Sequence, residues 1–160
     1  MFGALTRTLA ATGAGAVAIQ LVQYGDMAFM QRKASDIPSG IAIGLARFAG
    51  VDLNDAGDEQ ADLRRASRRE AIGELLGFAT LLTFGLAYGA VRRGRSGFRP
   101  LTGAAFGLGA MASTEVLASA LGVTDVTEWT PNEWASELAP HLAYGFVLAS
   151  VYARLAKPRD

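Results

Sequence analysis

The chain of 160 residues contains no cysteine, a single histidine and two tryptophans. Without cysteine there is no disulfide framework and no thiolate metal site. A single histidine is also too few for the two Glu-x-x-His pairs that a di-iron site in a four-helix bundle uses. Basic and acidic residues are equal in number, 15 of each, and this balance argues against a nucleic-acid partner.

Sequence signatures of catalysis are missing as well. The segments GAGAVA (13–18) and GLGAMAST (107–114) are rich in glycine, but neither follows a predicted strand, so no nucleotide-binding loop is predicted. No serine lies in a nucleophile elbow, and a hydrolytic triad would need the single histidine. The sequence therefore does not indicate an enzyme and implies no cofactor.

What the chain does have is long apolar runs. Hydrophobic residues make up 51% of it and collect at residues 8–30, 71–91, 101–121 and 138–156. Each run approaches the ~20 residues that a helix needs to cross about 30 Å of hydrocarbon. Because backbone groups in lipid must be paired within the segment, we expect each run to be helical. The sequence predicts an all-α integral membrane domain over 1–160, a bundle of four transmembrane helices with a helical extramembrane loop at 31–70.

Two other interpretations of the runs were weighed. A cleaved signal peptide would use Arg7 as its basic region, but Gln20, Gln23 and Asp26 stand where cleavage requires small residues. A soluble helical core would have to tolerate glycines four residues apart, which are costly in water and common in membranes. These spacings are Gly73/Gly77, Gly85/Gly89 and Gly103/Gly107. They predict close helix packing, and we expect association with a second copy or a larger membrane complex.

The distribution of charge predicts an orientation in the bacterial plasma membrane. Eight basic residues fall on the side of the termini and of the second loop: Arg7, Arg92, Arg93, Arg95, Arg99, Arg154, Lys157 and Arg159. The third loop has no basic residue and carries Asp125, Glu128, Glu133 and Glu137. The positive-inside rule then places the termini in the cytoplasm. The first loop opposes this, with seven basic residues of its own: Arg32, Lys33, Arg47, Arg64, Arg65, Arg68 and Arg69.

Both longer loops carry helix signals. In the first, Ile37, Ile41, Leu45 and Phe48 share one face of a short predicted helix that ends at Gly50 and lies on the membrane or on the bundle. The segment DEQADLRRASRRE (58–70) is acidic first and basic last, which favours a helix running unbroken into the second membrane helix.

In the third loop, Thr130, Pro131 and Glu133 form a predicted capping box followed by a short helix. The two tryptophans, Trp129 and Trp134, lie beside it. We expect them to anchor the loop at the level of the lipid headgroups.

Four ionisable residues lie within the predicted membrane helices, one on each. Asp26, Glu74, Glu115 and His141 all fall roughly 5–9 Å below the outer surface at 1.5 Å per residue. Charged groups at such depth cost about 2.5–3.5 kcal/mol each, so they usually face one another or a wet cavity. Two further residues, Gln23 and Tyr144, lie beside Asp26 and His141 by helical spacing. The sequence therefore predicts one outward polar layer of six residues.

Three interpretations of this layer stay open. The first is a hydrogen-bonded polar plug in which His141 pairs with Glu115 or Asp26 and specifies helix packing. The second is a proton or cation site, since an imidazole and carboxylates held together titrate near neutral pH. The third is a single metal ion held by the candidates His141, Glu115 and Asp26.

Several segments resemble a known group of proteins. LGVTDVTEW (121–129) and EWASELAPHLAYG (133–145), preceded by RPLTGAAFGLGAMA, are similar to a group of small uncharacterised membrane proteins of high-GC Gram-positive bacteria with an LGVTDP-x-x-W stretch and a PHLAYG motif. Val126 stands where that group has proline, and Glu137 where it tends to have aspartate. The resemblance implies about four membrane helices and marks Pro140-His141, but it implies no activity or substrate.

Together these observations predict a small membrane protein of structural, accessory or binding type, with lipid as its surroundings. A proton- or cation-translocating module is the alternative, and a metal-dependent membrane enzyme comes third.

Overall fold

The computed structural model describes residues 3–31, 33–54, 57–93 and 95–157. They form five α-helices: α1 (Ala4–Met30), α2 (Ile37–Phe48), α3 (Glu59–Arg92), α4 (Pro100–Ala120) and α5 (Pro131–Ala156), with a short 3-10 turn, η1 (Val126–Glu128), before α5. No strand occurs in these residues, and the all-α prediction is confirmed. Arg32 and Arg159, two of the basic residues counted for orientation, lie outside the described residues.

Three helices, α1, α3 and α4, are long and apolar enough to cross a membrane by length and composition. This identifies the chain as a candidate membrane protein. The fourth predicted crossing lies in α5, which has 26 residues but is not among the apolar candidates. Its run includes His141, Arg154 and two tyrosines, and these polar groups lower its mean hydropathy. Composition alone therefore supports three of the four predicted crossings.

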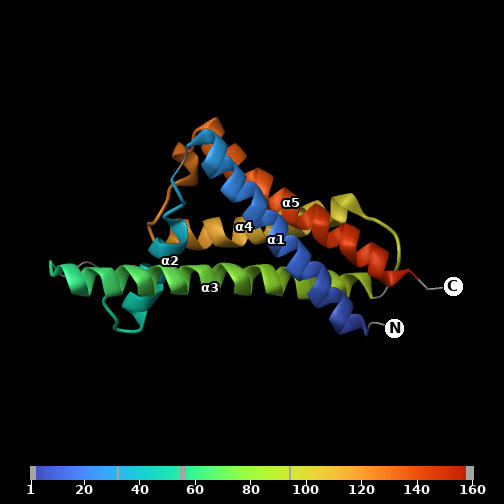
Figure 1. The fold of residues 1–160 in the computed structure, drawn as a ribbon, viewed down its shortest axis with the longest axis horizontal. Helices are drawn as coiled ribbons and strands as arrows, with labels where there is room; N and C mark the ends of the chain where they lie inside the picture. The colour runs from blue at the N-terminus through green and yellow to red at the C-terminus, as the bar shows by residue number, and fades with distance from the viewer. Residues whose placement is uncertain (1–2, 32, 55–56, 94, 158–160) are drawn as a thin grey trace.

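The helices form a V that is closed at one end and open at the other (Figure 1). At the closed end Gly85 and Gly89 of α3 lie so close to Thr12 and Thr8 of α1 that a Cβ on either glycine would overlap the threonine. Each threonine hydroxyl donates to the carbonyl four residues earlier, at 2.9 Å, so its polar group is already paired. Both chain ends lie at this closed end, and α1 and α5 diverge from α3 towards the other.

Helix α2 lies in the open end of the V and packs on α3. The backbone of Pro38 lies against Gly73, and Gly40 and Gly44 face Val123 and Leu121 beyond α4. The predicted helix is present on the bundle, but its predicted apolar face is partly wrong. Ile41 is buried, whereas Phe48 is 84% exposed. The inner face is instead the one that carries the glycines, because it is the small residues that allow close approach.

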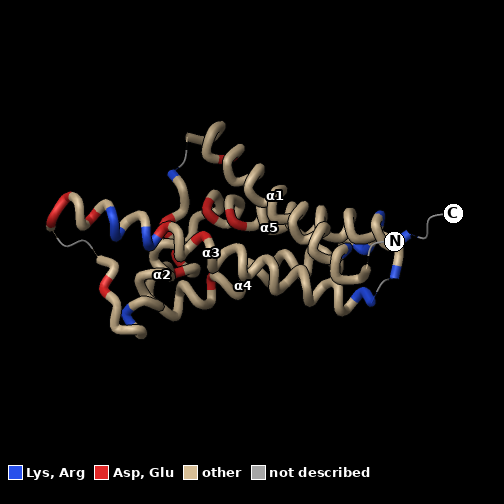
Figure 2. Tube along the Cα trace, turned by 60° about the horizontal axis from the view of Figure 1, so that its bottom comes forward, with Lys and Arg blue, Asp and Glu red and all other residues tan. Residues whose placement is uncertain are grey.

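Helix α3 runs without a break over 34 residues, so the predicted continuity of the charged segment with the membrane helix is confirmed. The Asp58 side chain caps its start by accepting from Ala61 N at 2.8 Å. Its charged first part extends past the rest of the bundle (Figures 1 and 2). There Arg65 donates to the Asn54 carbonyl at 2.6 Å and holds the preceding loop against the helix.

Helix α5 begins with the predicted capping box, in which Thr130 and Glu133 bond reciprocally. The prediction of a separate short helix before the last membrane segment is wrong, since α5 continues through Pro140 to Ala156. Proline supplies no N–H and usually interrupts a helix. Here Pro140 is among the fully buried side chains, so packing stabilises the continuous helix, as neighbouring helices do in membranes.

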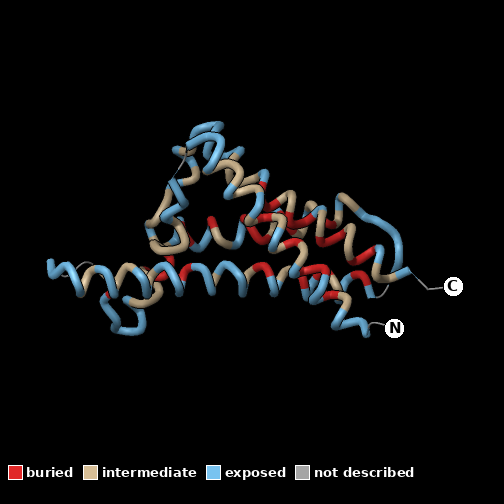
Figure 3. The backbone as a smooth tube through the Cα atoms, in the orientation of Figure 1, coloured by how far each residue is buried: buried red, intermediate tan, exposed pale blue. Residues whose placement is uncertain are grey.

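The buried residues gather where the helices converge (Figure 3), and many large apolar residues are exposed on the outside. Tyr88 is fully buried and packs edge-to-face on Phe106 and Tyr152, at centroid distances of 5.5 and 5.4 Å. Large apolar side chains meanwhile point outward, with Phe29 at 87% and Leu101 at 84% exposure. An exposed apolar surface of this extent in a soluble protein would cause association, but it is the expected surface for a helix in lipid.

Candidate functional site

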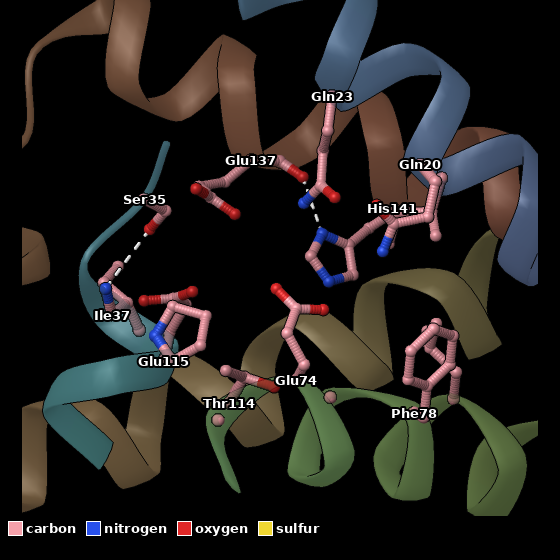
Figure 4. Close-up of a pocket in the computed structure, with 15 residues that line it drawn as sticks. Gln20, Gln23, Ser35, Ile37, Glu74, Phe78, Thr114, Glu115, Glu137 and His141 are labelled. Atoms are coloured by element: carbon pink, nitrogen blue, oxygen red, sulfur yellow. Dashed lines mark hydrogen bonds between the residues drawn. The ribbon is translucent and has the colours of Figure 1, made fainter. Parts of the chain in front are cut away.

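A cavity of about 110 Å³ lies in the opening of the V, between α1, α3, α4 and α5. Figure 4 shows its side chains converging from these helices and from the segment that precedes α2. Polar groups make up about half of the lining: Gln20, Gln23, Ser35, Glu74, Thr114, Glu115, Glu137 and His141. The remainder is apolar. Three carboxylates and one imidazole thus line a space with room for a single small molecule.

His141 is held by its own helix. Its Nδ1 lies 2.8 Å from the backbone oxygen of Glu137, one turn earlier. Because a carbonyl oxygen can only accept, Nδ1 carries the hydrogen, and in the neutral ring Nε2 is the acceptor. The imidazole is 8% exposed, and Figure 4 shows its second nitrogen on the side of Glu74. The predicted pairing of His141 with a carboxylate of Glu115 or Asp26 is therefore replaced by a bond to a backbone carbonyl.

Glu115 is the most buried acid of the site. It lies on α4, is 7% exposed, and its Oε2 is buried without any hydrogen-bond partner. Most buried carboxylates are paired, because an unpaired buried polar group costs about 1–3 kcal/mol. Its position on the cavity wall means that this cost is removed only when something inside the cavity donates to it.

Glu74 and Gln23 also line the cavity. The structure therefore brings four of the six predicted site residues to one cavity, the other two members being Glu115 and His141. Glu74 is on α3, in an exposed position, and its carboxylate reaches into the opening (Figure 4). Gln23 is on α1 and approaches from the opposite side.

The other two predicted residues lie elsewhere. Asp26 does not line this cavity but a neighbouring hollow of about 290 Å³, together with Lys33 and Glu70. Tyr144 lies below the site, fully buried, and its hydroxyl donates to the Leu81 carbonyl at 2.5 Å. Asp26 is one turn further along α1 than Gln23, where α1 has already diverged from α3, and Tyr144 is one turn of α5 deeper than His141.

The structure gives no support to the metal interpretation. Among the residues that it describes, no three histidine, aspartate or glutamate side chains are grouped so as to hold a metal ion. The candidate ligands His141 and Glu115 share a cavity, but Asp26 lies outside it.

Four polar lining residues were not predicted as site residues: Glu137, Gln20, Ser35 and Thr114. The sequence places Glu137 in the outer loop because the predicted membrane run begins one residue later, at Leu138. A helix continued through Pro140 places Glu137 four residues before His141 on one face, and this spacing is the signal that would have found it. Gln20 precedes Gln23 by three residues, so the same spacing rule places both side chains on one face of α1. Ser35 and Thr114 carry no such signal.

Comparison with known proteins adds no family to this geometry. No protein-family model matches the chain, and neither does any curated protein or solved structure. The resemblance to small membrane proteins of high-GC Gram-positive bacteria stays a prediction.

Proposed function

We propose that this chain is a membrane-integral binding protein of accessory type that holds a small cation in its outward acidic cavity. The observation that carries the proposal is the carboxylate of Glu115, which is buried on the cavity wall with Oε2 unpartnered. Two more carboxylates, those of Glu74 and Glu137, line the same space. A cation is the guest that offsets the desolvation of an acid at membrane depth.

The proposal includes four crossings, with α5 as the fourth. Supporting it, α5 packs against α1 and α4 and runs from the open to the closed end of the V. Three of its polar side chains point inward, since His141, Tyr144 and Tyr152 are all buried in the bundle, whereas Arg154 is exposed near its end. A helix whose polar side chains face neighbouring helices can present an apolar surface to lipid despite a modest mean hydropathy.

The proposed orientation places the termini in the cytoplasm and the cavity mouth outside, in a bacterial plasma membrane. Figure 2 supports it in that the charged residues at the closed end are basic and the acidic residues gather around the open end, although basic residues of α2 and of the first part of α3 also lie at the open end. We further propose that the exposed apolar faces contact lipid, a second copy of the chain or a larger membrane complex.

Binding is favoured over translocation by the packing below the cavity. Leu81, Tyr144 and Leu148 belong to one core cluster between the cavity and the closed end, and Tyr144 bonds to the Leu81 carbonyl. A proton or cation path would need a continuous row of polar groups or water beyond this point. The cavity is therefore proposed as a binding site with one opening rather than a stage of a channel.

Equilibrium dialysis of the protein in nanodiscs of uncharged lipid tests the proposal. Sodium, potassium and methylammonium are supplied separately in radiolabelled form. We expect one of them to bind at a ratio of one per chain. Its affinity should fall at least about tenfold in Glu115→Gln. The matched control is Glu128→Gln, an exposed acid of η1 outside the cavity, which should bind as the wild type does. If none of the three cations binds, the proposal is wrong.

A further inference from the structure

We infer that the cation is the head of a small primary amine, an alkylammonium ion of a few heavy atoms, held between Glu115, Glu74 and His141. This inference rests on the proposed function and names the chemical class of its ligand. Charge alone does not identify the ligand, because sodium, potassium and ammonium all carry one positive charge but need differently arranged acceptors.

The acceptors are arranged for a group with three N–H donors. An ammonium head donates three hydrogen bonds and accepts none. The cavity offers the unpartnered Oε2 of Glu115 from α4, the carboxylate of Glu74 from α3 and Nε2 of His141 from α5. Nε2 is available because the Nδ1 hydrogen is used on the Glu137 carbonyl. Three acceptors on three different helices surround the space from three sides, as Figure 4 shows.

The same residues suit an alkali ion less well than an amine. One of the three acceptors is an imidazole nitrogen, whereas a hard cation prefers oxygen ligands or else keeps its water. A hydrated alkali ion would also expose its water shell to the apolar part of the wall.

The apolar half of the wall suits a short alkyl chain. Ile19, Leu81 and Phe78 line the cavity beside the acids. An aromatic face near an ammonium group adds roughly 0.5–1 kcal/mol at a partly exposed site. In size, a cavity of about 150 Å³ admits benzene, so about 110 Å³ fits a smaller molecule, such as methyl- to propylammonium.

Selectivity is the first test, and it separates this inference from the proposed function. Wild-type protein in nanodiscs is titrated with methylammonium, propylammonium, sodium and potassium. We expect both amines to bind at least about tenfold more tightly than either alkali ion. Alkali ions that bind as tightly as the amines, with binding lost in Glu115→Gln, would overturn the amine inference and leave the cation site standing. If no cation binds, both are wrong.

Gly77 provides the second test, because it lines the cavity and a Cβ added there meets no atom within 4 Å. Gly77→Ala therefore fills part of the cavity without disturbing a helix contact. We expect propylammonium to lose affinity about five- to tenfold and methylammonium less than threefold.

The matched control is Gly13→Ala on α1, where an added Cβ likewise meets nothing and which does not line the cavity. It should bind both amines as the wild type does. Equal loss of both amines in the two variants, or no loss in Gly77→Ala, would show that the amine does not occupy this cavity.

Discussion

The Nδ1 atom of His141 lies 2.8 Å from the backbone oxygen of Glu137, one turn earlier on α5. This bond joins two residues on either side of Pro140. The helix continues through Pro140 to bring the carbonyl of Glu137 next to the ring, and the ring is thereby turned with Nε2 towards the cavity. Orientation of an imidazole through a carbonyl on its other nitrogen is a common way of fixing the tautomer.

The tautomer can be measured directly, because the chain has only one histidine. We expect nitrogen NMR of protein labelled at this residue to report the Nδ1–H form when the ring is neutral. Addition of the amine should shift the Nε2 resonance and leave Nδ1 nearly unchanged. A dominant Nε2–H form would contradict both the hydrogen bond and the acceptor role of Nε2.

Removing the unpartnered carboxylate should stabilise the empty protein. Glu115→Met keeps the length of the side chain and eliminates a buried polar atom without a partner. We expect the free energy of unfolding to rise by about 1–2 kcal/mol, because the desolvation penalty disappears.

Thermal unfolding in detergent, followed by circular dichroism, measures this change. Glu128→Met serves as the exposed control and should stay within about 0.5 kcal/mol of the wild type. A marked loss of stability in Glu115→Met would mean that Glu115 is a structural residue, contrary to its assignment as a binding residue.

Tyr144 should separate packing from binding. Its hydroxyl donates to the Leu81 carbonyl below the cavity and does not line the cavity itself. Tyr144→Phe removes one buried hydrogen bond and should cost about 1 kcal/mol in unfolding free energy. Dialysis should find cation affinity within twofold of the wild type. A larger loss of affinity would return Tyr144 to the site in which the sequence placed it.

The stability of the protein should depend on pH through Asp125, which lies in the loop between α4 and α5. The hydroxyl and the backbone N–H of Thr127 both donate to its carboxylate, and they hold the pKa of Asp125 below its ordinary value of 3.8. A lowered pKa means that the native state favours the charged form, so this stabilisation is present above pH 3.8 and is lost as the pH falls through the lower, folded-state pKa.

We therefore expect Asp125→Asn to flatten part of the decline in melting temperature as the pH falls below 3.8. Glu128→Gln is the control for an exposed acid in the same turn and should leave the slope unchanged. An identical slope in wild type and Asp125→Asn would contradict the prediction.

The absence of cysteine makes the membrane topology directly testable. Single cysteines introduced at Ser96, between α3 and α4, and at Thr127, between α4 and α5, lie in exposed positions. In intact cells a membrane-impermeant maleimide should label Thr127→Cys and not Ser96→Cys. A third single-cysteine variant, Lys157→Cys, reports on α5. If this cysteine is not labelled in intact cells, the result supports a fourth crossing. Labelling of Lys157→Cys would leave three crossings.

Local features of the fold could be predicted because they depend on short stretches of sequence. The apolar runs indicated where the long helices lie, three of them long and apolar enough to cross a membrane, and the capping box at Thr130 and Glu133 predicted the start of α5. The order of charges after Asp58 was enough to predict an unbroken α3. The full extent of α5 could not be predicted from its apolar run, which begins at Leu138, whereas α5 begins at Pro131 and continues through the buried Pro140.

The height of a side chain along a helix follows from residue number alone, at 1.5 Å per residue, and so the sequence by itself determined that Glu74, Glu115 and His141 lie at one level. Which side chains meet at that level also depends on how each helix is rotated and at what angle it crosses its neighbours, and these are set by contacts between distant residues. Gly85 and Gly89 let α1 and α3 touch at one end, and Pro38 against Gly73 holds α2 between the helices at the other. The resulting V brings Glu137 and Gln20 to the cavity and leaves Asp26 beside it, which only the tertiary structure decided.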